Sequence, residues 1–177
     1  MYKIRVVFEK IENVFINISL LSIFLMMLAI FADVTMRYVF NSPIPGITEM
    51  SGDYFMVLIV FLAISYTHKE NGHVKADVIE SRLSKKMKVI LDIFKGLLII
   101  SVLSIIFISS INIFFEYLQN DVRSVGSIEY LIAPAYLVIA IGLLLMIIRL
   151  VLNIVDILQS FSKRDLPTSY KESGDKS

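Results

Sequence analysis

The chain has 177 residues, of which 56% are hydrophobic and 19% are charged, and its mean hydropathy is +0.76. Soluble domains have about 45–50% apolar and about 25% charged residues, so these values exclude a soluble globular protein and predict an all-α integral membrane protein. The formal net charge of +1 gives no sign of a nucleic-acid partner. The absence of cysteine excludes disulfides, thiolate metal sites and cysteine nucleophiles.

Four apolar segments predict four transmembrane helices within one domain, residues 1–160. Three of them contain uncharged runs, at residues 14–32, 96–115 and 130–148. These runs approach the ~20 residues needed to cross a hydrocarbon core of about 30 Å. We expect spans at about residues 12–38, 47–68, 90–117 and 130–157, followed by a disordered cytoplasmic tail at 161–177.

The basic residues predict the orientation of the chain. Thirteen lysines and arginines lie before the first span, between the second and third, or after the fourth, whereas the other two connections hold Arg37 and Arg123. The positive-inside rule therefore predicts that both termini and the middle connection are cytoplasmic. The first apolar run is too long for a signal-peptide core, so we expect an uncleaved signal anchor. Lys95 and Arg149, near the cytoplasmic ends of their spans, are expected to extend toward that surface.

The second span is short of apolar residues. Its uncharged run, residues 54–67, would cover roughly 21 Å as a helix, so the span must include residues before it. The preceding stretch NSPIPG, residues 41–46, contains two prolines and a glycine and predicts a turn. Glu49 then opens the second helix, where the helix dipole favours an acid, and Asp53 follows one turn later.

The connection after the second span, residues 73–88, has apolar residues every four positions among basic ones. This pattern predicts an amphipathic helix on the cytoplasmic membrane surface, and the alternative is a solvated basic loop. In the helical interpretation four residues contact anionic lipid headgroups: Lys75, Arg82, Lys85 and Lys86.

No pattern in the chain predicts catalysis or a cofactor. The two histidines, His68 and His73, are five positions apart and do not share a helical face as metal or haem ligands would. No nucleophile triad, phosphate-binding loop or zinc motif is present. Polar residues on the third helix favour helix packing over a pore; they are Ser101, Ser104, Ser109, Asn112 and Glu116.

Four charges surround the first turn: Asp33, Arg37, Glu49 and Asp53. They suit an internal structural clamp, contact with a second membrane protein, or direct proton or substrate transfer. Because an unpaired arginine at membrane depth costs roughly 2.5–3.5 kcal/mol, Arg37 is expected to pair with a carboxylate. We predict that Arg37 and Glu49 meet, either with each other or across a subunit boundary.

Residues 37–79 resemble the small membrane subunit of tripartite ATP-independent periplasmic (TRAP) transporters, the DctQ-like family. The resemblance rests on an arginine closing helix one, a proline turn, a glutamate opening helix two, and a Gly-His pair followed by an acid. In this chain the residues are Arg37, Pro43 or Pro45, Glu49, Gly72, His73 and Asp77. Gly46 and Ile47 stand where family members often have an aromatic residue. The similarity extends over roughly residues 10–160.

The resemblance implies a non-catalytic subunit of the bacterial inner membrane that scaffolds a large, DctM-like permease subunit. Together they would take up an organic acid by sodium symport, with a periplasmic DctP-like binding protein delivering the substrate. His73 and Asp77 join the four charges at the first turn as structural or interface candidates. Two rival interpretations are a self-sufficient homodimeric exporter that uses Glu49 or Asp53, and a non-catalytic subunit of a membrane redox complex.

Overall fold

The computed structural model describes residues 2–69 and 85–162, and every regular element in these ranges is helical. Four helices are long and apolar enough to cross a membrane, at Arg5–Val39, Ile47–His68, Val89–Gln119 and Ala133–Gln159. The predicted fold class, all-α with four membrane-spanning helices, is confirmed. The elements are α1 (Tyr2–Val39), α2 (Ile47–Met50), the π-helical turn η1 (Ser51–Met56), α3 (Val57–Lys69), α5 (Lys85–Gln119) and α6 (Ala133–Ser162).

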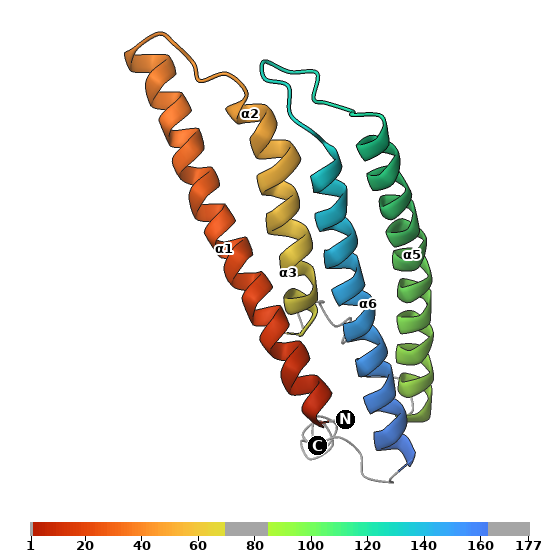
Figure 1. Cartoon of the computed structure of the whole chain (residues 1–177). Coiled ribbons are helices and arrows are strands. Elements are labelled where there is room, and N and C mark those ends of the chain that lie inside the picture. Colours follow the sequence, from red (N-terminus) through yellow and green to blue (C-terminus); the bar gives the residue numbers. More distant parts are fainter. Residues whose placement is uncertain (1, 70–84, 163–177) are drawn as a thin grey trace.

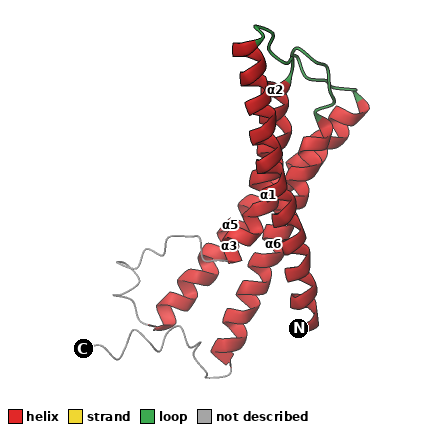
Figure 2. Ribbon diagram, turned by 90° about the vertical axis from the view of Figure 1, so that its left-hand side faces the viewer, coloured by secondary structure: helices red, strands yellow, loops and turns green. Residues whose placement is uncertain are grey.

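The four spans pack as a row rather than as a closed ring. α1 packs against α3, α3 against α6, and α6 against α5. Figure 1 shows this order across the molecule, and Figure 2 shows that the lower part of α5 diverges from α1. The edge helices of the row are therefore α1 and α5, and each has a neighbour on one side.

The two inner helices of the row are α3 and α6, and α6 holds most of the buried apolar side chains, among them Ala140, Leu143 and Met146. Small residues let its neighbours approach closely, as is common between transmembrane helices. A Cβ added to Gly142 would lie 2.2 Å from the backbone oxygen of Phe61 on α3. Glycine is thus required where α3 crosses α6.

Both connections at one end of the row are short and irregular. Residues 40–46 join α1 to α2 and end at Gly46, whose φ of 79° suits glycine. Residues 120–132 join α5 to α6 and contain Asp121 with a φ of 48°. α1 begins and α6 ends at the opposite end of the row (Figure 1). We call the end with these two connections the loop end, and the other the open end.

The structure changes one expectation about the second span. Instead of a continuous α-helix, α2 passes into η1, a single wider turn, before α3 begins. Turns of this kind bulge the helix and often occur at functional positions. Asp53 and Tyr54 both lie within η1.

Some predictions concern residues that the structure does not describe. His73, Lys75, Asp77 and Arg82 lie outside the described ranges, as do residues 163–177 of the predicted tail, 161–177. The first two residues of that predicted tail, 161 and 162, end α6. The predicted amphipathic helix falls mostly in the same gap. Lys85 and Lys86 begin α5, and their contact with the membrane surface stays a prediction.

Candidate functional site

At the loop end, Asp33 joins α1 to the connection that follows it. The carboxylate is 5% exposed; Oδ1 accepts a hydrogen bond from the backbone N–H of Ile44 at 2.8 Å, and Oδ2 accepts one from Arg37 at 2.9 Å. Arg37, one helical turn later, has a half-exposed side chain. Asp33 therefore holds the connection after α1 in place, and the half-exposed Arg37 side chain neutralises the Asp33 carboxylate.

Glu49, at the start of helix two, contacts the second connection. Its Oε1 accepts weak hydrogen bonds from the backbone N–H and the hydroxyl of Ser127, at 3.4 and 3.5 Å. Its Oε2 is buried and has no hydrogen-bond partner among the described residues. Gly126 leaves room for the carboxyl group, since a Cβ there would lie 2.9 Å from the Glu49 Cδ. Glu49 is thus a poorly satisfied carboxylate.

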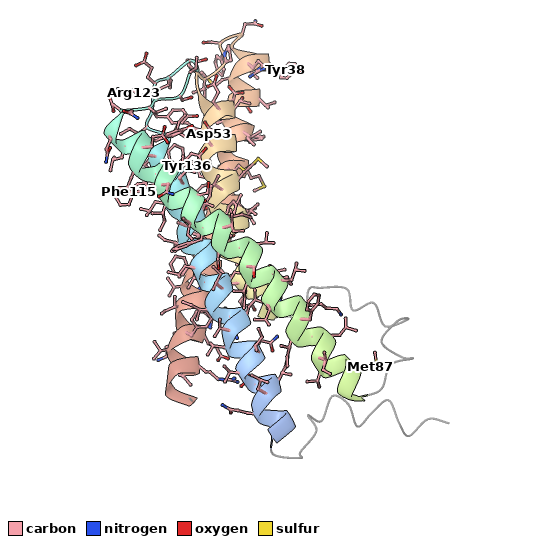
Figure 3. All side chains as sticks on the ribbon, turned by 90° about the vertical axis from the view of Figure 1, so that its right-hand side faces the viewer. Tyr38, Asp53, Met87, Phe115, Arg123 and Tyr136 are labelled. Carbon is pink, nitrogen blue, oxygen red and sulfur yellow. The ribbon has the colours of Figure 1, made fainter. Side chains whose placement is uncertain are left out.

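Asp53 and Tyr54 are neighbours in η1 and reach the same stretch of the second connection. Asp53 accepts a hydrogen bond of 2.7 Å from the Tyr130 hydroxyl, and the Tyr54 hydroxyl donates to the backbone oxygen of Leu131. The rings of Tyr54 and Tyr130 lie 5.4 Å apart. Figure 3 shows Asp53 near the top of the row, close to Tyr136. These contacts join helix two to the start of α6.

Tyr130 lies in the connection, before the span of α6 begins. Burial raises the pKa of its phenol, and the negative charges of Asp53 and Glu49 raise it further. The hydroxyl therefore stays protonated at neutral pH and remains a donor to Asp53.

A second polar network lies toward the open end and crosses three helices. Glu12 of α1 is 1% exposed and accepts hydrogen bonds from the Arg149 guanidinium of α6, through Nε at 2.9 Å and through Nη2. The hydroxyl of Ser65, on α3, donates to the same carboxylate. The Arg149 guanidinium also lies 5.2 Å from the ring centre of Phe8. Both charges are thus paired, and the carboxylate accepts a further bond from the serine.

One further ion pair lies closer to the open end than the Glu12–Arg149 pair. Arg5 of α1 pairs with Asp156 of α6, and both side chains are more than a third exposed. An exposed pair contributes little, about 0–1 kcal/mol. The buried Glu12–Arg149 pair is therefore the main polar link between α1 and α6.

The structure allows the predicted site residues to be placed. Asp33, Arg37, Glu49 and Asp53 all lie at the loop end. Arg37 bonds to Asp33 rather than to Glu49, so an Arg37–Glu49 pair does not form within the chain. The alternative across a subunit boundary stays a prediction.

The prediction that Arg149 extends toward the cytoplasmic surface is wrong. Its side chain turns into the row, pairs with Glu12 and is 16% exposed. Burial in this position is tolerated because Glu12 supplies the opposite charge. The signal for Glu12 was weak, since it stands among charged residues near the N-terminus and is 137 positions from Arg149.

The polar residues of α5 do not line an internal path. Ser101, Ser109, Asn112 and Glu116 are exposed, and Ser104 is half-buried. Among the described residues no group of three His, Cys, Asp or Glu side chains could hold a metal ion.

Comparison with protein families identifies one match. Residues 26–160 match the family model described as the DctQ component of tripartite ATP-independent periplasmic transporters. The match includes α2, η1, α3 and α5 completely, the last part of α1 from residue 26, and most of α6. The chain matches no curated protein and no solved structure.

Proposed function

Because the chain belongs to the DctQ family of TRAP transporter components, we propose that this small membrane subunit is a static scaffold for the large permease subunit. The complex would import an organic acid by sodium symport, after a periplasmic binding protein delivers the substrate. The chain itself would bind neither sodium nor substrate and would catalyse no reaction.

The Glu12–Arg149–Ser65 network is the observation that carries the scaffold role. It joins α1, α3 and α6 through one buried carboxylate, so separating α1 from α6 would leave two unpaired charges, and moving α3 would remove the hydrogen bond from Ser65. Separating such a pair costs several kcal/mol. A subunit that must stay rigid while its partner moves benefits from a contact of this kind.

Two carboxylates at the loop end, Asp33 and Asp53, support the same role. Asp33 is bonded to Arg37 and to the backbone of Ile44, and Asp53 is bonded to Tyr130. Carboxylates engaged in this way are poorly placed to carry protons or to bind a substrate. They do hold both connections of the loop end in place.

The open row of helices also favours a subunit that needs a neighbour. A row leaves two faces and two edges in contact with the surroundings, and most of the apolar side chains of α1 and α5 are exposed. Lipid can cover such surfaces, but a large permease subunit can cover them as well and gain packing contacts.

We place the chain in the bacterial inner membrane, with the loop end periplasmic and the open end cytoplasmic. Single cysteines can test this, because the chain has none of its own. Val125 is fully exposed in the second connection and Ser42 is exposed in the first, whereas Met87 lies near the other end of α5. An impermeant thiol reagent applied to intact cells should label cysteines at 42 and 125 but not at 87. The reverse pattern would overturn the orientation.

Reconstitution tests the function itself. The chain, the large permease subunit of the same transporter and the binding protein are combined in proteoliposomes, and uptake of a labelled organic acid is followed with and without a sodium gradient. We expect uptake to require all three proteins and sodium. The decisive control contains the permease and the binding protein alone. Full uptake in that control, or uptake by the chain alone, would refute the scaffold role.

A further inference from the structure

We propose that the outward surface of α5 is where this chain contacts a transmembrane helix of the large permease subunit. This inference rests on the proposed function and specifies its interface. The surface is defined by one line of residues, named here the α5 stripe: Ser101, Ile105, Ser109, Asn112 and Glu116.

The stripe points away from the rest of the chain. With 3.6 residues per turn its five residues fall within a sector of about 80°, and all five are exposed. The buried residues Gly96 and Ser110 lie on the opposite side of the helix, where Gly96 faces Ile154 of α6. α5 is an edge helix, so no other described helix packs over the stripe.

Two members of the stripe have polar groups without a partner in the chain, and one of them, the Asn112 amide, lies deeper in the span than Glu116. The Asn112 amide and the Glu116 carboxylate have no hydrogen-bond or ion-pair partner within the described residues. Asn112 lies seven residues before the end of the span at Gln119, which is roughly 10 Å along the helix. The span of 31 residues is roughly 46 Å long, so when it is centred on a hydrocarbon core of about 30 Å, Asn112 lies just inside the core. Hydrocarbon offers no hydrogen bonds, so an amide there is favourable only against protein or water.

The neighbouring sector of the same helix provides the contrast. Leu97, Ile108 and Phe115 lie beside the stripe, are also exposed, and have no polar side-chain atom. Ser101 differs from Asn112 in that its hydroxyl already bonds to the Leu97 carbonyl of its own helix. The outer side of α5 is thus divided into a sector suited to lipid and a sector that offers hydrogen-bonding groups.

The stripe also defines the chemistry of the partner. Asn112 offers both a donor and an acceptor, and matches a serine, threonine, asparagine or glutamine on the facing helix. Glu116, nearer the loop end, requires a donor, best an arginine or lysine close to the membrane surface. Ser109 has a small side chain and allows the facing helix to approach closely.

Photo-cross-linking in the intact complex tests the proposal. A benzophenone amino acid replaces Ile105, Ser109 or Asn112 in turn, and Leu97, Ile108 or Phe115 in the control set. The chain is co-expressed with the large permease subunit, the membranes are irradiated, and cross-linked peptides are identified by mass spectrometry. We expect the stripe positions to cross-link to a transmembrane helix of the permease and the control positions to give no such product.

The possible failures separate this proposal from the proposed function. If the permease co-purifies but the stripe gives no product, gives products with a second copy of this chain, or cross-links no better than the control set, the interface is wrong and the scaffold role survives. If the permease does not co-purify with the unmodified chain, the scaffold role fails and this inference fails with it.

A substitution measures the contribution of the amide. Asn112→Leu should weaken binding to the permease in detergent by about three- to thirtyfold, the range for one hydrogen bond between membrane helices. The matched control Ile108→Leu should bind like the unaltered chain. Because both positions face outward, neither change should alter the thermal unfolding of the chain alone. Unaltered binding of the Asn112→Leu chain would overturn the proposal.

Discussion

The two ends of the helix row satisfy their charges in different ways. At the loop end, carboxylates bond to nearby backbone groups, to a tyrosine or to an arginine one turn away, and Arg37 and Glu49 keep contact with the surroundings. Toward the open end, one carboxylate is completely enclosed and receives an arginine and a serine from two other helices. The first arrangement fixes turns, whereas the second fixes whole helices.

This difference decides how much each contact should contribute to stability. Water or headgroups can replace a partner at an exposed site, so the loss of one interaction costs little. An enclosed charge has no substitute partner, and removing its mate leaves the full desolvation penalty. The contacts toward the open end should therefore dominate the stability of the row.

Arg149→Met should have the largest effect. The substitution keeps much of the side-chain volume but leaves Glu12 enclosed without its cation, at a cost of about 3–5 kcal/mol. The free energy of unfolding can be measured on the purified chain in mild detergent by titration with SDS.

Two variants control this experiment. Arg5→Met breaks the half-exposed pair with Asp156 and should cost at most about 1 kcal/mol. The double change Glu12→Gln with Arg149→Met removes both charges and should recover part of the loss. If Arg149→Met and Arg5→Met cost the same, the contrast between enclosed and exposed charges is wrong.

Gly142→Ala should have the next largest effect, through packing rather than charge. The new Cβ would meet the Phe61 backbone oxygen at 2.2 Å, and backbone cannot move aside as a side-chain end can, so α3 and α6 must separate. We expect a loss of about 1–3 kcal/mol in the same titration. Gly52→Ala is the matched control, because nothing lies within 4 Å of its Cβ. Equal effects of the two changes would contradict the close crossing of α3 and α6.

The sequence contained enough information for the four spans and the charges at the loop end. Length and hydropathy specify a transmembrane helix because lipid imposes one requirement on every residue of a span. Asp33 and Arg37 are one turn apart on the same helix, so their contact can be derived from local geometry, whereas the predicted Arg37–Glu49 pair does not form within the chain. Both inferences need short-range information alone.

The row arrangement and the Glu12–Arg149 pair could not be predicted in the same way. Which spans are neighbours depends on packing between helices, and Glu12 and Arg149 stand 137 positions apart. The π-helical turn at Ser51–Met56 also has no local signal comparable to the prolines before it. Arg149 was misplaced because the snorkelling rule assumes that no partner is available inside the bundle.

Tyr130→Phe should have a smaller effect, at the loop end. The change removes the donor to Asp53 but keeps the ring beside Tyr54, and Asp53 is accessible enough to recruit water. We expect a loss of about 1 kcal/mol in the unfolding titration. Tyr38→Phe, which removes a hydroxyl from a side chain that is 80% exposed, should have no effect. If Tyr130→Phe lowered the free energy of unfolding as much as Arg149→Met does, the contacts at the two ends would, contrary to our expectation, not differ in their contribution to stability.

The smallest effect within the chain is expected for Arg37 and Glu49. The Arg37 side chain is half-exposed, so water can replace it beside the buried Asp33, which keeps its bond from the Ile44 N–H, and we expect the pair to contribute less than about 1 kcal/mol. Since Glu49 bonds to Ser127 instead, a double-mutant cycle of Arg37→Ala and Glu49→Ala should give a coupling energy near zero. A cycle of Arg37→Ala and Asp33→Ala is the matched control and should give a measurable coupling.

Substitutions of Arg37 and Glu49 should be more informative when binding to the permease subunit is measured than when unfolding of the chain alone is measured. Glu49 has a buried oxygen without a partner, and Arg37 projects from the end of α1, so either could meet an opposite charge on the permease subunit. If so, Arg37→Ala or Glu49→Ala would lower permease binding while leaving the chain's own unfolding nearly unchanged. The charge swap Arg37→Glu with Glu49→Arg should then fail to restore binding, because each residue would face the wrong charge on the partner. Restoration by the swap would instead show that Arg37 and Glu49 meet each other, which would contradict the contacts described at the loop end.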